Sequence, residues 1–368
     1  MKISCSKQSL MNGINIVSKA VSTKSTMPNL QCILIESSLS EIRLIANDIE
    51  LGIETIIEGN IIEAGRIALD AKRFSDMIRK LPDSEILIET NSNCETVIRC
   101  EKIKFDISGI SGDDFNYLPD VEKNKSFTLS QFSLREVIHQ TIFSISNQEN
   151  AKIMTGELFE INGDELKVVS LDGHRISIRK VQLKETYDAI KVIVPGKTLN
   201  EISKIITGGV DDEIHIYVTD KHILFEFEQT KIVSRLLEGE FYKIDQMLSN
   251  DYETKFTINK KEFLDCIDRS SLFINESDKK PIILNIENSE IHLNINSSTG
   301  SSMNETIEIK KEGKDLRIGF NPKFLMDALR VIDDEEVNIY MINAKSPCFI
   351  RNEDNSYIYL ILPVSIVA

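Results

Sequence analysis

The sequence has 368 residues, of which 41% are hydrophobic and 27% are charged, so it is long enough for two to four domains with substantial cores. This length and composition exclude a peptide, a disulfide miniprotein and a disordered tail. The net charge of −15 by itself argues against a nucleic-acid partner, because phosphate binding is mostly electrostatic.

The N-terminal segment MKISCSKQSL lacks the apolar core of a signal peptide, and no apolar run approaches the ~18 to 20 residues that span a membrane. We therefore expect a cytoplasmic protein that has no membrane partner. The six cysteines are scattered at spacings that match no zinc or redox motif. We expect them to be reduced, and we expect neither a metal site nor a cofactor.

One amphipathic helical pattern occurs three times along the chain, starting at Ser6, Ser130 and Asn259. In the first copy, apolar residues recur at intervals of four, three and four from Leu10 to Val21, which places one apolar stripe on an α-helix. The second copy has the same spacing, apart from a threonine in the stripe. The starts are 124 and 129 residues apart, which indicates an internal repeat.

A second helical pattern follows each copy, starting at Ala71, Pro195 and Asn321, and each leads into an acidic turn and an alternating strand. Stretches of alternating apolar and polar residues lie between and after the helices. Residues 32–46, 158–170 and 283–296 are examples, and each pattern predicts a strand, a short polar turn and a strand. Each repeat is therefore predicted to hold two helices on β-sheet.

The polar stretches 120–126 and 248–255 mark the expected domain boundaries. We predict three α+β domains at residues 1–124, 125–250 and 251–368, each of a common domain size. A chance likeness of three ordinary amphipathic helices is the alternative. Against it, both helices recur in the same order, at similar separations and with similar flanking strands.

Positive charge is concentrated in the six predicted helices. Together they carry a net charge of +8 in a chain of net charge −15, so the remainder carries −23. If all six helices face one surface, that surface is a basic lining on an acidic body and can bind phosphates. The alternative is that Lys and Arg simply favour exposed helix faces. A lining without aromatic side chains would contact the nucleic-acid backbone rather than recognise a base sequence.

Five segments carry a family resemblance: the N-terminal MKISCSKQSL, then SLDGHRIS, KVIVPGKTLNEISK, SRLLEGEF and the tail YIYLILPVSIVA. The chain strongly resembles the bacterial replicative sliding clamp, the β subunit of DNA polymerase III, in order and over its whole length. The resemblance implies three clamp domains per chain and a head-to-tail homodimer that closes a ring around duplex DNA. It also implies a non-enzymatic processivity factor that tethers the replicative polymerase.

The segment from Asp172 to Arg175 has three possible interpretations: a catalytic cluster, a structural turn or the wall of a binding pocket. No nucleophile or second histidine lies nearby in the sequence, which disfavours catalysis. In clamps, the matching segment borders the hydrophobic groove that binds linear peptides of the polymerase, the clamp loader and other partners. By resemblance, the groove comprises Met154, Thr155, Leu171, Gly173, His174, Arg175, Ile176, Tyr242, Met247, Leu360, Leu362, Pro363, Val364 and Ile366. Tyr242 and Met247 are bulkier than the usual occupants and predict a narrower cleft.

The candidate DNA contacts come from two sources, the family resemblance and the charged residues of the predicted helices. They are Lys24, Lys72, Arg73, Arg79, Lys80, Gln148, Lys152, Lys197 and Lys204. For the dimer interface, the resemblance marks Leu272 and Phe273 on one side and the strand that holds Phe105 and Ile107 on the other. Ordinary core positions are the alternative for all four.

Two other functions compete with the sliding clamp. One is a ring or scaffold that binds only proteins, with incidental basic helices. The other is an enzyme built around Asp172 and His174. A stable dimer is required for a closed ring, and neither rival requires one.

Overall fold

The computed structural model describes residues 1–22, 25–273, 281–296 and 300–366. The candidate DNA contact Lys24 lies outside these described residues. The chain forms two compact units, which we describe separately. The first comprises residues 1–132 and 201–236, and the second comprises residues 133–200 and 237–368.

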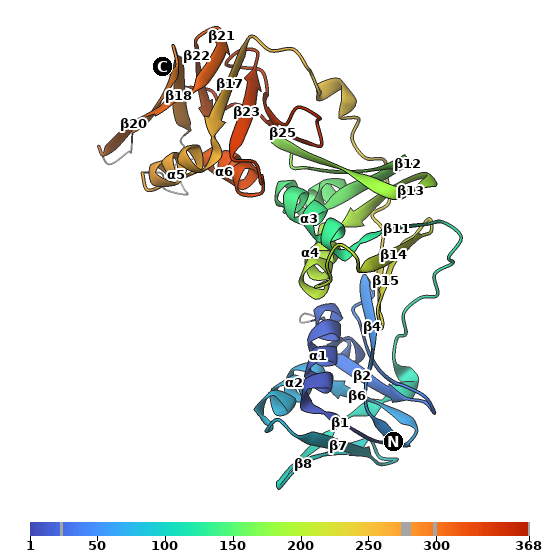
Figure 1. The fold of residues 1–368 in the computed structure, drawn as a ribbon. Coiled ribbons are helices and arrows are strands. Elements are labelled where there is room, and N and C mark those ends of the chain that lie inside the picture. The colour runs from blue at the N-terminus through green and yellow to red at the C-terminus, as the bar shows by residue number, and fades with distance from the viewer. Residues whose placement is uncertain (23–24, 274–280, 297–299, 367–368) are drawn as a thin grey trace. The chain divides into compact units, whose positions relative to one another are not determined.

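The first unit contains two antiparallel sheets (Figure 1). In order across the five-stranded sheet lie β5 (Asn60–Glu63), β1 (Lys2–Ser6), β7 (Glu85–Thr90), β8 (Glu95–Cys100) and β9 (Ile103–Ser108). The nine-stranded sheet runs β10 (Ile110–Ser111), β6 (Gly65–Asp70), β2 (Cys32–Ser37), β3 (Ile42–Asn47), β4 (Leu51–Ile57), β16 (Thr230–Arg235), β15 (His222–Phe227), β14 (Glu213–Val218) and β11 (Ser126–Ser130).

Helices α1 (Lys7–Val17) and α2 (Ala71–Lys80) pack side by side in this unit, as Figure 1 shows. Each begins at a side-chain cap: the Ser6 hydroxyl accepts a hydrogen bond from the Ser9 amide at 3.1 Å, and Asp70 caps α2 in the same way. Leu10, Ile14 and Val17 of the predicted stripe are fully buried. These apolar side chains therefore pack α1 against the strands, as their spacing predicts.

The second unit also contains two antiparallel sheets. The seven-stranded sheet runs β12 (Gly156–Leu171), β13 (Arg175–Pro195), β25 (Tyr357–Ile361), β24 (Cys348–Arg351), β23 (Glu336–Met341), β17 (Thr254–Asn259) and β21 (Lys310–Gly313). The four-stranded sheet runs β20 (Ser302–Glu308), β19 (Glu290–Asn296), β18 (Ile282–Glu287) and β22 (Leu316–Phe320). Helices α5 (Lys260–Ser271) and α6 (Pro322–Arg330) pack against each other.

The remaining helices are α3 (Gln131–Thr141) and α4 (Gly196–Ile205), and the division between the units falls within both. All six α-helices therefore begin within one residue of the positions expected from the repeat. Short 3₁₀ turns complete the list: η1 (Ser18–Ala20), η2 (Pro28–Gln31), η3 (Gly112–Asp114), η4 (Ile142–Ser144), η5 (Glu149–Thr155) and η6 (Asp245–Met247).

One expected hairpin is wrong. Residues 158–170 were predicted as strand, turn and strand, but they belong to the single long strand β12. The polar residues at its centre form an irregularity in the pairing with β13, where Gly163 has a positive φ of 66°. Glycine adopts this conformation without strain, so the strand bends at Gly163 and continues.

Two strand pairings connect segments that lie far apart in the sequence. In the first unit β4 pairs with β16, with Ile53 opposite Ile232. In the second unit β13 pairs with β25, with Ser177 opposite Tyr359. We call these the first joint and the second joint. Each pairing crosses one of the boundaries predicted from sequence, so the sheets continue from one repeat into the next.

Glu157, on β12, is fully buried, and neither of its carboxylate oxygens has a hydrogen-bond partner among the described residues. Burial raises the pKa of Glu157 to about 8, because the charged form loses its hydration and the nearby Thr141 hydroxyl offsets this loss only in part. The carboxyl group is therefore mostly protonated at neutral pH.

Candidate functional site

Ten of the fourteen residues predicted for the groove surround one cavity of about 500 Å³ in the second unit. They are Met154, Leu171, Gly173, His174, Arg175, Ile176, Tyr242, Met247, Leu360 and Leu362. Most of these side chains are apolar, and a largely apolar cavity with few polar groups is typical of a site for apolar side chains.

Two walls of the cavity come from the second joint. Leu171 is the last residue of β12, and Ile176 near the start of β13 lies directly opposite Leu360 of β25. The pairing extends past the end of β25, where the Leu362 amide donates a hydrogen bond to the His174 carbonyl at 2.9 Å. The strand register therefore fixes the spacing between these two walls.

A third wall comes from the segment between β16 and β17. Tyr242 and Met247 line the cavity but remain 45% and 51% exposed. The neighbouring Phe241 is buried and anchors the segment, and its ring meets that of Tyr242 edge to face with centroids 6.2 Å apart. Exposed apolar side chains at a cavity mouth are available to a partner.

Gln246 and Pro347 also line the cavity, and sequence reasoning missed both. Gln246 precedes Met247, so its place beside a predicted residue could have indicated it. Pro347 lies in the loop between β23 and β24, and only the strand order of the sheet brings it to the site.

Four predicted groove residues do not line the cavity: Thr155, Pro363, Val364 and Ile366. The tail beyond Leu362 follows β22 instead, and the Val364 amide donates a hydrogen bond to the Gly319 carbonyl at 2.8 Å.

The segment from Asp172 to Arg175 is a turn held by an ion-pair network. Asp172 accepts hydrogen bonds from the His174 and Arg175 amides at 2.9 and 3.1 Å. The Arg175 guanidinium donates to Asp172 at 3.0 Å and to Asp327 of α6 at 2.7 Å, and it lies 4.5 Å from the ring centre of Phe324. The turn is thus both a structural link to α6 and a wall of the cavity.

A second cavity of about 530 Å³ shares His174 and Arg175 with the first, and Asp172 and the predicted DNA contact Gln148 also line it. Gln148 and Lys152 are exposed at the start of η5 and within it. Lys197 and Lys204 are exposed on α4, where Lys204 pairs with Glu201 at 2.8 Å.

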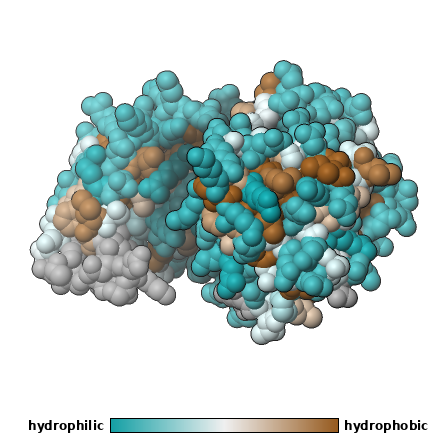
Figure 2. Space-filling view, turned by 90° about the horizontal axis from the view of Figure 1, so that it is seen from below, coloured by the Kyte–Doolittle hydropathy of each residue, from teal (hydrophilic) through white to brown (hydrophobic). Residues whose placement is uncertain are grey.

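Four predicted DNA contacts lie together on α2. This helix buries Phe74 and Ile78 and exposes Lys72, Arg73, Arg79 and Lys80. Arg79 bonds to Asp76 at 3.2 Å on the same helix. Hydrophilic residues also cover most of the face of the molecule in Figure 2. The exposed face of α2 therefore presents a compact group of cations to solvent.

The four residues predicted for the dimer interface lie at surface elements. Phe105 is half-buried and Ile107 is 8% exposed on β9, the last strand of its sheet. Leu272, just after α5, is 82% exposed, whereas Phe273 packs against the core of its unit. An edge strand and a nearly fully exposed leucine are both typical of association surfaces.

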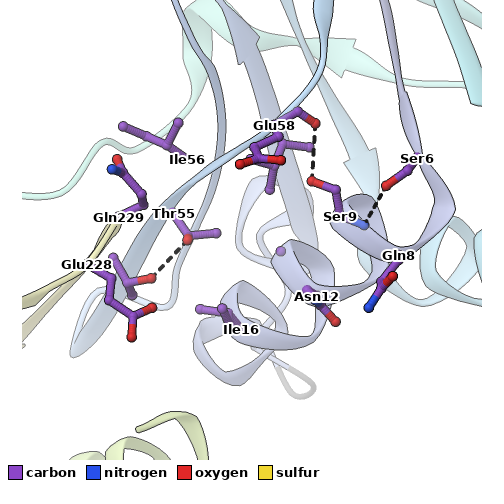
Figure 3. A pocket seen from close by; sticks show the side chains of 13 residues that line it. Ser6, Gln8, Ser9, Asn12, Ile16, Thr55, Ile56, Glu58, Glu228 and Gln229 are labelled. Atoms are coloured by element: carbon purple, nitrogen blue, oxygen red, sulfur yellow. Dashed lines mark hydrogen bonds between the residues drawn. The ribbon is translucent and has the colours of Figure 1, made fainter. Parts of the chain in front are cut away.

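A polar cavity of about 480 Å³ lies in the first unit between α1 and the first joint (Figure 3). Thr55 and Thr230 share a hydrogen bond of 2.9 Å across the joint, and the Ser9 hydroxyl donates to the Glu58 carbonyl at 3.1 Å. The lining residues described here include Glu58 and Glu228 but no Lys or Arg, so the cavity does not favour phosphate.

All six cysteines have free thiols and five are buried. Burial raises the pKa of the Cys5 thiol to about 12 and that of Cys32 to about 11, so these thiols are poor nucleophiles. The described residues hold no group of three or more His, Cys, Asp or Glu placed to bind a metal ion. Within the same residues, no helix is both long and apolar enough to cross a membrane.

Comparison with known proteins gives matches along nearly the whole chain. Family models of the DNA polymerase III beta subunit match at residues 1–119 (N-terminal domain), 128–243 (central domain) and 245–365 (C-terminal domain). A beta sliding clamp from Staphylococcus epidermidis is 33% identical over 99% of both chains.

Solved structures give the same result. The DNA polymerase sliding clamp of Bacillus subtilis superimposes with a TM-score of 0.97 at 31% identity over 100% of both chains. A candidate DNA polymerase III beta subunit from Eubacterium rectale is 63% identical, with a TM-score of 0.96 over 99% of both chains.

Proposed function

We propose that this chain, which belongs to the DNA polymerase III beta-subunit family and is a DNA sliding clamp, closes head to tail with a second copy into a ring around duplex DNA. A clamp is a processivity factor for the polymerase, because tethering keeps the polymerase at a high effective concentration near the primer end. The match of three successive family models to the chain supports this function. The chain performs this role without catalysis and without a cofactor.

Duplex DNA is held through its phosphates, independently of base sequence. The exposed cations of α2 support this assignment, together with Gln148, Lys152, Lys197 and Lys204. Lys24, outside the described residues, completes the set predicted from sequence. Phosphate contacts position a duplex and carry no base information, so a ring lined in this way slides along DNA.

The ring closes where β9 of one chain meets the end of α5 in the other. Both sides expose apolar groups, with Leu272 the most prominent. The edge strand β20 lies beside this helix, since Arg269 of α5 donates to Glu305 of β20 at 3.0 Å. Two edge strands next to complementary apolar side chains can continue a sheet from one chain into the other. Two identical contacts then close a ring.

Partners dock in the apolar cavity at the second joint. The replicative polymerase, the clamp loader and other proteins with clamp-binding peptides would each insert large apolar side chains between Leu171, Ile176 and Leu360. Such side chains act as anchors, and the surrounding contacts exclude water. The convergence of ten predicted residues on this cavity is the observation that carries the assignment.

The test is retention on closed DNA. The chain is loaded onto nicked circular DNA by a clamp loader, and its retention is measured before and after the circle is cut. A ring should remain on the circle and leave the linear product by sliding off its ends. A scaffold that binds only proteins would be retained on neither form.

A further inference from the structure

The two joints are built alike. In the first joint Gly52 lies opposite Val233, and in the second Ile176 lies opposite Leu360. Gly52 and Ile176 are 124 residues apart in the sequence, which equals the offset between the starts of the first two repeats. Because Ile176 and Leu360 line the apolar cavity, Gly52 and Val233 mark the corresponding place in the first unit.

The turns before these strands also correspond. Asp48 accepts hydrogen bonds from the amides of Glu50 and Leu51 at 3.1 and 2.8 Å. Asp172 likewise accepts hydrogen bonds from the amides two and three residues later in the chain. Ile49 has a φ of +81°, and Gly173 at the same position of the second turn has a φ of +89°. The left-handed region is costly for a β-branched residue, so the shared turn shape is imposed by the joint.

The place that is a cavity in the second unit is filled in the first. Leu118, in the linker between η3 and β11, packs against the clusters that contain Leu34 and Val233. It also fits against the bare backbone of Gly52, where a Cβ would lie 2.7 Å from the Leu118 Cγ. The linker therefore inserts a large apolar side chain between the same two strand positions that would hold a partner's anchor in the second unit.

Hydrogen bonds hold the linker in this position. The buried Asn47 amide donates to the carbonyls of Asn116 and Tyr117, each at 3.1 Å, directly before Leu118. The residue that corresponds to Asn47 in the second unit is Leu171. A leucine side chain cannot donate such bonds, and it lines an open cavity instead.

We propose that residues 115–121 are a built-in ligand of the first joint, where Leu118 occupies a latent groove that corresponds to the peptide groove. Removing this ligand exposes a second site for peptides that end in large apolar side chains. The proposal rests on the peptide groove assigned to the second joint. It explains why, among the described residues, the place of the groove is open at the second joint and filled at the first.

The test counts bound peptides. A synthetic ten-residue peptide that carries a glutamine and ends in Leu-Phe is titrated calorimetrically into the full-length chain and into the double variant Asn47→Ala, Leu118→Ala. We expect one peptide per chain for the unmodified protein and two for the variant. Hydrogen exchange should show peptide protection at Gly52 and Val233 in the variant alone.

Two further variants complete the design. Leu39→Ala removes a leucine that is 97% exposed in the same unit, and it should leave the stoichiometry at one. Asn47→Ala alone retains Leu118 but loses the bonds to the Asn116 and Tyr117 carbonyls, so chymotrypsin should cleave after Tyr117 faster while the stoichiometry stays at one. This single variant still gives a result if the double variant does not fold.

Each outcome is decisive. A folded double variant that still binds one peptide overturns the latent groove and leaves the proposed function intact. An unchanged rate of cleavage after Tyr117 in Asn47→Ala overturns the role of the Asn47 hydrogen bonds in holding the linker. No peptide bound by the unmodified chain would instead contradict the peptide groove itself.

Discussion

Replacing Leu272 by Ala should dissociate the proposed ring without unfolding the chain. The side chain is 82% exposed in the single chain, so in the proposed ring most of its apolar surface would be buried by the partner. Leu→Ala removes three carbons, at ~0.8 kcal/mol for each buried CH₂ group. Scaled by its exposure, the loss is about 2 kcal/mol per contact. A head-to-tail dimer has two identical contacts, so the ring loses about 4 kcal/mol, which is a ~10³-fold weaker dimer.

Sedimentation equilibrium across a dilution series measures this change directly. Leu39→Ala removes the same carbons from a turn outside the proposed interface and is the matched control. Phe273 is left intact because it packs against the core of its own unit, and its loss would also affect folding. A Leu272→Ala dimer that is less than ~tenfold weaker than the unmodified dimer would refute the interface assignment.

Three other changes test the DNA lining, the groove and the buried carboxyl. Lys72→Ala combined with Lys80→Ala should reduce the slope of log affinity against log salt on duplex DNA by about 1.8, at ~0.9 per lost phosphate contact. Leu362→Asp should weaken peptide binding at least ~tenfold in calorimetry, because it places a charge in an apolar wall. Glu157 holds its proton in the folded state up to a pH of about 8, whereas the unfolded chain releases it near 4.5. The free energy of unfolding by urea should therefore decline as pH rises from 4.5 to 8, and Glu157→Gln should remove this contribution.

Each of these changes has a control or a contradicting result. Lys345→Ala removes an exposed cation of the loop between β23 and β24, outside the helices, and should leave the salt slope unchanged. Val364→Asp alters a tail residue outside the cavity lining and should affect peptide affinity less than Leu362→Asp does. Identical pH profiles for Glu157→Gln and the unmodified chain would show that this carboxyl group is not the cause of the slope.

Local patterns predict the helices and most of the short hairpins. The stripe from Leu10 to Val17 and the side-chain caps at Ser6 and Asp70 are encoded within a few residues, so sequence is sufficient to place these helices. The irregularity at Gly163 was misread as a turn because glycine serves both a turn and a bent strand.

The joints and the cavity depend on contacts that no local pattern encodes. Ile176 pairs with Leu360 across half of the chain length, and Pro347 reaches the cavity through strand order alone. The groove residues were therefore identified by resemblance rather than by periodicity. Leu118 was missed because an apolar residue in a linker without periodicity looks the same in the sequence whether it is exposed or packed.

The central claim is that two copies of this chain encircle duplex DNA, and topology tests it most directly. Chains loaded onto nicked circular DNA are passed through a sizing column before and after a restriction enzyme linearises the circle. Encirclement predicts that chains elute with the circle at a salt concentration that abolishes simple electrostatic binding, and that linearisation releases them. Equal retention on circular and linear DNA, or none on either, would contradict it.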